Sequence, residues 1–156
     1  MGYIMDSSSL KYILDEFPKS LIPKVWEKFE KLCEDEIVIS DREVTNELAL
    51  ELNNAKSIEW VEKNKKVFQM LTTDESVLLG NLISEGVFSQ YENSDRIIQR
   101  KLPEAIPFII AKAKHNDYTI VYRKNNRNES TIIDICNQKN IKCCEVEDFL
   151  IDINKS

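Results

Sequence analysis

Carboxylates placed beside strand ends are the residues of this chain best suited to chemistry. Asp6 closes the first apolar run, "YIMD", which reads as a short buried strand. Glu43 and Glu47 lie four residues apart in "DREVTNELALELN", so a helix would put them on one face. Asp134 lies in a predicted helix, "TIIDICNQKN", after another strand. Such oxygen ligands suit Mg²⁺ or Mn²⁺, and two of these ions can clamp the attacking and leaving oxygens of a phosphodiester.

Each carboxylate also has an ordinary structural interpretation. Asp6 could cap the helix that starts at the following serines, although Ser7, Ser8 and Ser9 offer caps of their own. Glu43 fits a solvated helix surface, and Asp134 fits an acid near a helix start, where the helix dipole favours it. The spacing of Glu47 fits both interpretations. Residue types alone leave the choice between cap and ligand open.

Other kinds of catalytic site find little support in the sequence. The single histidine, His115, lies at a polar helix end, and the chain has 3 glycines, too few for a phosphate-cradling loop. The cysteines Cys33, Cys136, Cys143 and Cys144 form neither a CxxC pair nor a zinc pattern, so we expect buried free thiols.

The elements that would position the carboxylates alternate between strand and helix. Strands are predicted over 3–6, 37–40, 118–122 and 141–146, where apolar and β-branched residues gather. Amphipathic helices are predicted over 7–17, 21–35, 41–53, 57–71, 72–88, 103–116, 131–140 and 147–153, and a polar loop over 89–101. Alternation of this kind is typical of an α/β fold with a central parallel sheet covered on both faces. In such sheets ligands bind beyond the carboxyl ends of the strands, where Asp6 lies.

Length and composition predict one domain over residues 1–156. The chain is 42% apolar and 31% charged, without a low-complexity tract or an interdomain linker. No apolar run is long enough for a membrane span, and the first residues lack the features of a signal peptide, so we expect a cytoplasmic protein. The net charge of −6 argues against a general nucleic-acid coat but permits a local basic rim.

Successive blocks of the sequence resemble a PIN-like domain, related to the VapC-type toxins, in an uncharacterised bacterial branch. The blocks are "YIMDSSSL", "IVISDREVTNEL", "EAIPFIIAKAK" with "YTIVY", and "IIDICNQKNIKCCEVEDFL", and they cover nearly the whole chain in order. The resemblance implies a three-layer α/β/α fold. It also implies an Mg²⁺- or Mn²⁺-dependent ribonuclease with three or four clustered acids.

The acidic set implied by this resemblance is incomplete. The acid after the first strand falls on Asp6, the acid of the "EVxxEL" helix falls on Glu47, and the later block supplies Asp134. The acid that the family places before Pro-Phe is replaced by Ile106, and Arg123 and Lys124 follow "YTIVY" where threonine and acids are usual. A reduced site of Asp6, Glu47 and Asp134 implies weak or absent metal binding, because Mg²⁺ demands near-ideal octahedral geometry. The positions of Glu104 and Asp95 leave open whether either joins the site.

Two groups of basic residues could form a phosphate-binding rim. Arg96, Arg100 and Lys101 precede the "IPF" helix, and Arg123, Lys124 and Arg127 follow the 118–122 strand. Both groups could flank the strand ends, although solvated charged loops would look the same.

Two functions from different classes remain. The first is a metal-dependent endoribonuclease, the toxin of a toxin–antitoxin system, with impaired catalysis. The second is an inactive PIN-like domain that binds RNA or a protein. The retained acids favour the first, and the changes at Ile106 and Arg123 favour the second. The expected partners are RNA and an antitoxin protein, with a homodimer as a further assembly and no membrane.

Overall fold

The protein folds around one five-stranded parallel sheet. The computed structural model describes residues 2–88, 105–126 and 129–155. The strand order is β3-β2-β1-β4-β5, with β1 (Tyr3–Met5) at the centre between β2 (Val38–Asp41) and β4 (Thr119–Tyr122). The edges are β3 (Phe68–Gln69) and β5 (Cys143–Glu145). All four strand pairs are parallel, so every strand delivers its last residue to the same edge of the sheet.

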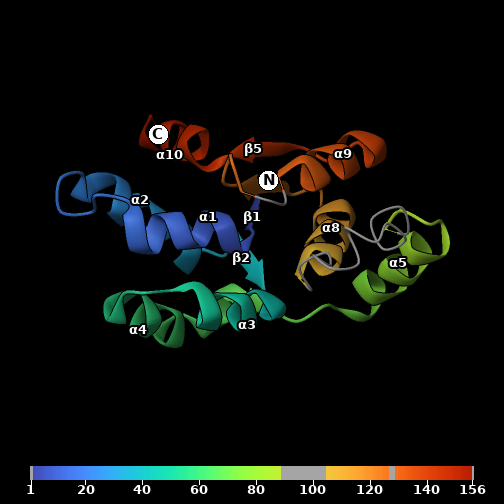
Figure 1. Ribbon diagram of the computed structural model, residues 1–156, viewed down its shortest axis with the longest axis horizontal. Helices are drawn as coiled ribbons and strands as arrows, with labels where there is room; N and C mark the ends of the chain where they lie inside the picture. The colour runs from blue at the N-terminus through green and yellow to red at the C-terminus, as the bar shows by residue number, and fades with distance from the viewer. Residues whose placement is uncertain (1, 89–104, 127–128, 156) are drawn as a thin grey trace.

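Helices cover both faces of this sheet (Figure 1). On one face lie α1 (Ser7–Lys11), its π-helical continuation η1 (Tyr12–Glu16), α2 (Pro23–Glu34) and α10 (Val146–Asn154). On the other lie α8 (Ala105–Asn116) and α9 (Glu129–Lys139), with α5 (Thr73–Ser84) packed on α8. This is the three-layer α/β/α arrangement that the PIN-like resemblance predicted.

The helix α3 (Arg42–Glu51) joins the two helical layers. It follows β2 directly and packs against α1, α8 and β3, while α4 (Ala55–Lys63) and the short 3₁₀ helix η2 (Lys65–Val67) lead from it to β3. Because α3 starts where β2 ends, its first turns lie at the carboxyl edge of the sheet. A side chain of α3 can therefore reach both the strand ends and the start of α8.

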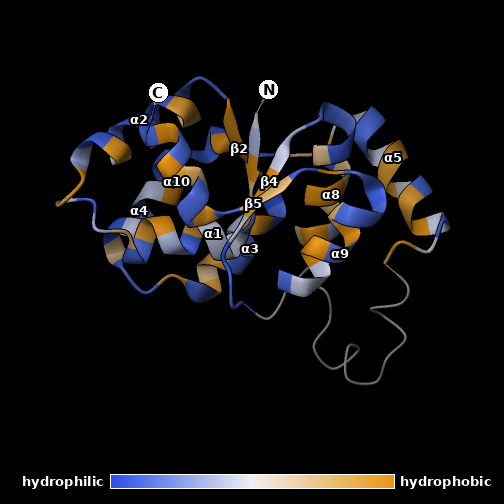
Figure 2. Cartoon of the chain, turned by 90° about the horizontal axis from the view of Figure 1, so that it is seen from above, coloured by the Kyte–Doolittle hydropathy of each residue, from blue (hydrophilic) through white to orange (hydrophobic). Residues whose placement is uncertain are grey.

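The core lies between the sheet and its helices. In Figure 2 the strands and the inward helix faces are apolar, whereas the outer faces of the helices are largely hydrophilic. Ile4, Val38 and Ile120 supply fully buried side chains from the three central strands. In the part of the chain that the structure describes, no helix is long and apolar enough to cross a membrane.

Most predicted elements are confirmed, with shifts of a few residues at their ends, and one is wrong. The helix predicted over 57–71 ends at Lys63, and the chain then forms η2 and the edge strand β3. Val67 and Phe68 fit a helical spacing, but they are buried where β3 pairs with β2. The predicted loop over 89–101 lies outside the described residues.

Candidate functional site

Asp6 lies at the carboxyl end of the central strand and caps the helix that follows. Its carboxylate accepts the backbone N–H of Ser9 at 2.8 Å and the Ser8 hydroxyl, which lies 2.8 Å from both oxygens. Only 5% of the residue is exposed. Burial raises the pKa of Asp6 to about 6, against the hydrogen bonds from Ser9 and Ser8, which lower it.

Glu47 brings a second carboxylate to Asp6. It projects from α3, is hydrogen-bonded by the Ser7 side chain and by the backbone N–H of Ala105, and interacts electrostatically with Asp6. Burial, opposed by those two hydrogen bonds and reinforced by Glu51 and Asp6, raises its pKa to about 7. The first helical layer, α3 and the start of α8 therefore meet around one buried and one half-buried acid.

This pair fits a divalent cation of the kind that keeps most of its water. Mg²⁺ is commonly held by one or two carboxylates, with water and substrate phosphate completing its shell. A carboxylate has about four acceptor sites, so the bonds to Ser8 and Ser9 leave Asp6 able to bind a further group. A cation would also offset the burial, and the smaller repulsion from Glu51 and Asp6, that raise the pKa of Glu47.

Among the described residues no third acid completes a metal-binding group with the pair, although the charge of Glu51 on α3 acts on both carboxylates. Within 2–88, 105–126 and 129–155, no three His, Cys, Asp or Glu side chains are grouped closely enough to hold a metal ion. Asp134 lies in α9 and is exposed. Ile106, which the PIN-like resemblance placed at an acid position, is 3% exposed and belongs to the core. Asp95 and Glu104 lie outside the described residues.

The backbone of Arg123 contacts the site, whereas its side chain contacts residues outside the site. Its N–H donates to the Ser8 hydroxyl at 3.0 Å, and that hydroxyl in turn donates to Asp6. Its guanidinium lies 4.1 Å from the centre of the Tyr12 ring and forms ion pairs with Glu145 at 3.2 Å and Glu147 at 3.0 Å.

The other residues of the predicted basic rim are described only in part. Lys124 pairs with Glu147 at 3.2 Å, so both described cations are shared with acids of β5 and α10. The remaining members, Arg96, Arg100, Lys101 and Arg127, lie outside the described residues. The RNA-binding rim stays a prediction.

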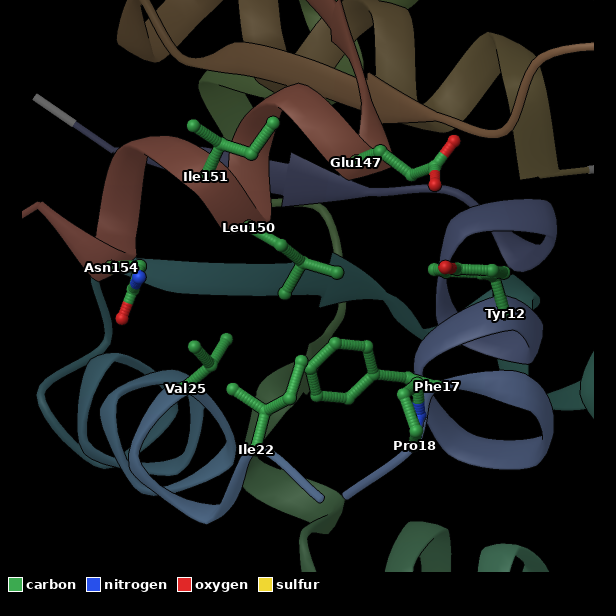
Figure 3. Close-up of a pocket in the computed structure, with 9 residues that line it drawn as sticks. All are labelled: Tyr12, Phe17, Pro18, Ile22, Val25, Glu147, Leu150, Ile151 and Asn154. Atoms are coloured by element: carbon green, nitrogen blue, oxygen red, sulfur yellow. The ribbon is translucent and has the colours of Figure 1, made fainter. Parts of the chain in front are cut away.

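Two further hollows lie near these residues. A cavity of about 470 Å³ beside α3 is bordered by Asp41, Arg42 and Phe108 among others. An apolar groove of about 280 Å³ lies between η1, α2 and α10, where Phe17, Ile22 and Leu150 point toward one another (Figure 3).

Several contacts of the site were not found from the sequence. The three serines were considered only as helix caps, yet Ser7 bonds Glu47 and Ser8 links Asp6 to Arg123. A run of serines after a strand-end aspartate was the available signal. No sequence signal pointed to the N–H of Ala105, because its position depends on how α8 packs in the fold.

Comparison with known proteins places the chain in a family. The family model "Domain of unknown function (DUF4411)" matches residues 3–155, almost the whole sequence. The chain belongs to the DUF4411 family. A comparison of the DUF4411 chain with curated proteins finds no significant match.

Solved structures resemble the DUF4411 chain in fold. VapBC2 from Rickettsia felis, in a crystal structure bound to a DNA fragment from their promoter, aligns with a TM-score of 0.54 and 16% identity over 93% of this chain and 98% of that one. FitAcB from Neisseria gonorrhoeae aligns with a TM-score of 0.48 and 14% identity over 92% and 97%. The likeness to VapBC2 agrees with the PIN-like, VapC-type fold that the sequence blocks predicted.

Proposed function

We propose that this protein is a PIN-like endoribonuclease of toxin type, dependent on Mg²⁺ or Mn²⁺ and weakened by loss of part of its acidic set. The observation that carries the proposal is the pairing of the buried Asp6 with the half-buried Glu47 at the carboxyl edge of the sheet. It is costly to bring a buried and a half-buried carboxylate together unless they serve a cation or a proton transfer.

Each residue of the pair has a separate task in this proposal. Ser8 and Ser9 fix the orientation of Asp6, while Ser7 and the N–H of Ala105 fix that of Glu47. The bound cation would supply Lewis-acid stabilisation of the phosphate and an activated water. Asp134 remains the proposed third ligand, and the rim of Arg96, Arg100, Lys101, Arg123, Lys124 and Arg127 the proposed RNA contact.

Calorimetric titration with Mn²⁺ tests the metal site. Wild type is expected to bind Mn²⁺ weakly, and Asp6→Asn and Glu47→Gln are each expected to abolish the binding. Asn can still cap α1, so a purely structural Asp6 would leave the titration unchanged. Glu43→Gln is the matched control, because it removes the same charge one turn earlier on α3. Equal binding by all four proteins would reject the site.

An inactive binding module is the second candidate. It is favoured by the apolar, buried Ile106 at the position of a family acid and by the lack of a three-acid group among the described residues. RNA binding without Mn²⁺ binding and without cleavage would select this candidate. Mn²⁺-dependent cleavage that disappears in Asp6→Asn would select the nuclease.

A protein partner belongs to the toxin proposal. The resemblance to VapC-type toxins implies an antitoxin, and VapBC2 is the neighbour that supports it. The groove in Figure 3 is a suitable surface, because Ile22 and Ile151 on its walls are 42% and 54% exposed and Leu21 beside it is 80% exposed. A homodimer over the same surface is the other assembly to test.

A further inference from the structure

The cavity beside α3 continues the carboxyl edge that carries the acidic pair. Met5 of β1 pairs with Ser40 of β2, so Asp6 and Asp41 are the next residues of two neighbouring strands. Asp41 borders the cavity, as do Met70 and Leu71, which follow β3. Parallel strands are about 4.8 Å apart, so the backbones of Asp6 and Asp41 are neighbours at this edge of the sheet.

The second wall of the cavity comes from the same helices that hold Glu47. Phe108 lies one turn after Ala105 on α8, and Asn46 precedes Glu47 on α3. The N–H of Ala105 binds Glu47, while Phe108 lines the cavity. The acidic pair and the cavity are thus two ends of one α3–α8 contact.

The lining combines an aromatic ring, acceptors and a cation. Phe108 is partly exposed, and Asp41 is 2% exposed, with one carboxylate oxygen accepting the N–H of Glu43 at 2.8 Å. That bond uses one of about four acceptor sites of the carboxylate. Arg42 is exposed at the rim, with its guanidinium 3.2 Å from the sulfur of Met70.

We propose that this cavity is a nucleobase subsite that takes a base with an exocyclic amino group, from an RNA strand whose phosphate lies at Asp6 and Glu47. The base stacks on Phe108, its amino group donates to Asp41, and Arg42 meets a neighbouring phosphate. The proposal rests on the proposed function for the position of that phosphate. The cavity volume of about 470 Å³ is ample for one base and lies within the range of ordinary ligand pockets.

Cytosine and uracil provide the sharpest comparison. They have the same ring size, but cytosine presents an amino group where uracil presents a carbonyl oxygen. A carboxylate accepts from the N4 amino group of cytosine and repels the oxygen of uracil. A good contact of this kind discriminates by roughly 5- to 150-fold in affinity.

Fluorescence anisotropy with labelled oligo(C) and oligo(U) of equal length tests the subsite. The titrations are made in Ca²⁺, so that a cation can join the phosphate to Asp6 and Glu47, and gels confirm that both oligomers stay intact. Wild type is expected to bind oligo(C) about tenfold more tightly than oligo(U). Asp41→Asn is expected to bring the ratio close to one, because an amide can also donate to uracil, while Asn retains the cap of α3. Phe108→Leu is expected to weaken binding of both oligomers.

A control and the overturning results follow from the same titrations. Glu59→Gln removes one acid from the exposed face of α4 and should keep the wild-type ratio. Equal affinity for the two oligomers, no RNA binding, or a ratio unchanged in Asp41→Asn would each overturn the subsite. Asp6→Asn should keep the ratio while losing Mn²⁺-dependent cleavage. A wild type that prefers oligo(C) but never cleaves RNA would refute the nuclease and leave the subsite standing.

Discussion

At the scale of single residues, Asp6 is both a helix cap and half of an acidic pair. Its bonds to Ser8 and Ser9 are those of a cap, and its neighbour Glu47 has no part in capping α1. The two interpretations that the sequence left open are therefore compatible. The cap holds the carboxylate still, and a fixed carboxylate is what a rigid metal site requires.

Ile106→Asp tests whether the acidic metal site implied by the PIN-like resemblance can be rebuilt in this protein. An aspartate in this buried position should lower the free energy of unfolding by several kcal/mol without metal. If residue 106 faces the acidic pair, Mn²⁺ should restore part of that loss and bind more tightly than in wild type. Thermal unfolding with and without Mn²⁺ measures both effects.

Ile109→Asp is the matched control for this substitution. Ile109 is 2% exposed on the same helix, so an aspartate there should cost as much stability. Mn²⁺ should not rescue it, because Ile109 lies nearly one turn further from Ala105. Rescue of both variants, or of neither, would count against a metal site at residue 106.

Glu47 should make stability fall as pH rises. Its pKa is raised by burial to about 7, so between pH 4.5 and 7 the native state holds a proton that the unfolded state has lost. Glu47→Gln should therefore gain stability relative to wild type, by about 1–2 kcal/mol at pH 8, and little at pH 4.5. Urea unfolding at both pH values measures the gain, and saturating Mn²⁺ should abolish it. A gain of equal size at pH 4.5 and pH 8 would contradict this account.

At the scale of elements, α5 and α8 are joined by a buried ion pair. Lys112 lies 2.6 Å from Glu75 and donates to the Met70 carbonyl, with 1% and 5% of the two side chains exposed. Burial raises the pKa of Glu75, but the bonds from Lys112, Thr72 and Asn116 outweigh it and leave the pKa lowered. This pair fixes the position of α8, and with it the N–H that binds Glu47.

Lys112→Met should destabilise the fold by about 3–5 kcal/mol, because it leaves a buried carboxylate without its cation. The exposed pair of Lys63 and Glu59 offers a control, and Lys63→Met should cost less than about 1 kcal/mol. Denaturant unfolding compares them. Equal losses would mean that Lys112 is not the main partner of Glu75.

The sequence was most informative where local pattern and tertiary role agree. The strands at 3–6, 37–40 and 118–122 could be predicted from their runs of apolar and β-branched residues. Such runs occur there because both faces of the central strands are covered by helices, which bury Ile4, Val38 and Ile120. The strand β3 was missed because two residues carry no periodicity of their own and only pairing with β2 makes them a strand. The position of Glu47 followed from its helix, but its contact with Ala105 depends on α8, far along the chain.

At the scale of the whole molecule, the groove between η1, α2 and α10 leaves apolar residues uncovered. In the absence of a partner protein, only a second copy of the chain can cover these apolar residues. The purified protein should therefore self-associate at high concentration. Ile151→Lys should suppress this association. Ile58→Lys, at an isoleucine on α4 that is 43% exposed, should not. Light scattering over a concentration series decides, and a wild type that stays monomeric throughout would contradict the expectation.

The central position of β1 also determines when the acidic pair can assemble during synthesis of the chain. Tyr3 pairs with Val38 on one side and with Thr119 on the other. A nascent chain that has not yet exposed β4 on the ribosome has β1 with one open edge, and such long-range pairing makes folding slow. Glu47 likewise waits for α8, which supplies the N–H of Ala105. The acidic pair therefore cannot assemble while only the first hundred or so residues have been translated, because its carboxylates are synthesised long before β4 and α8, which hold them in place.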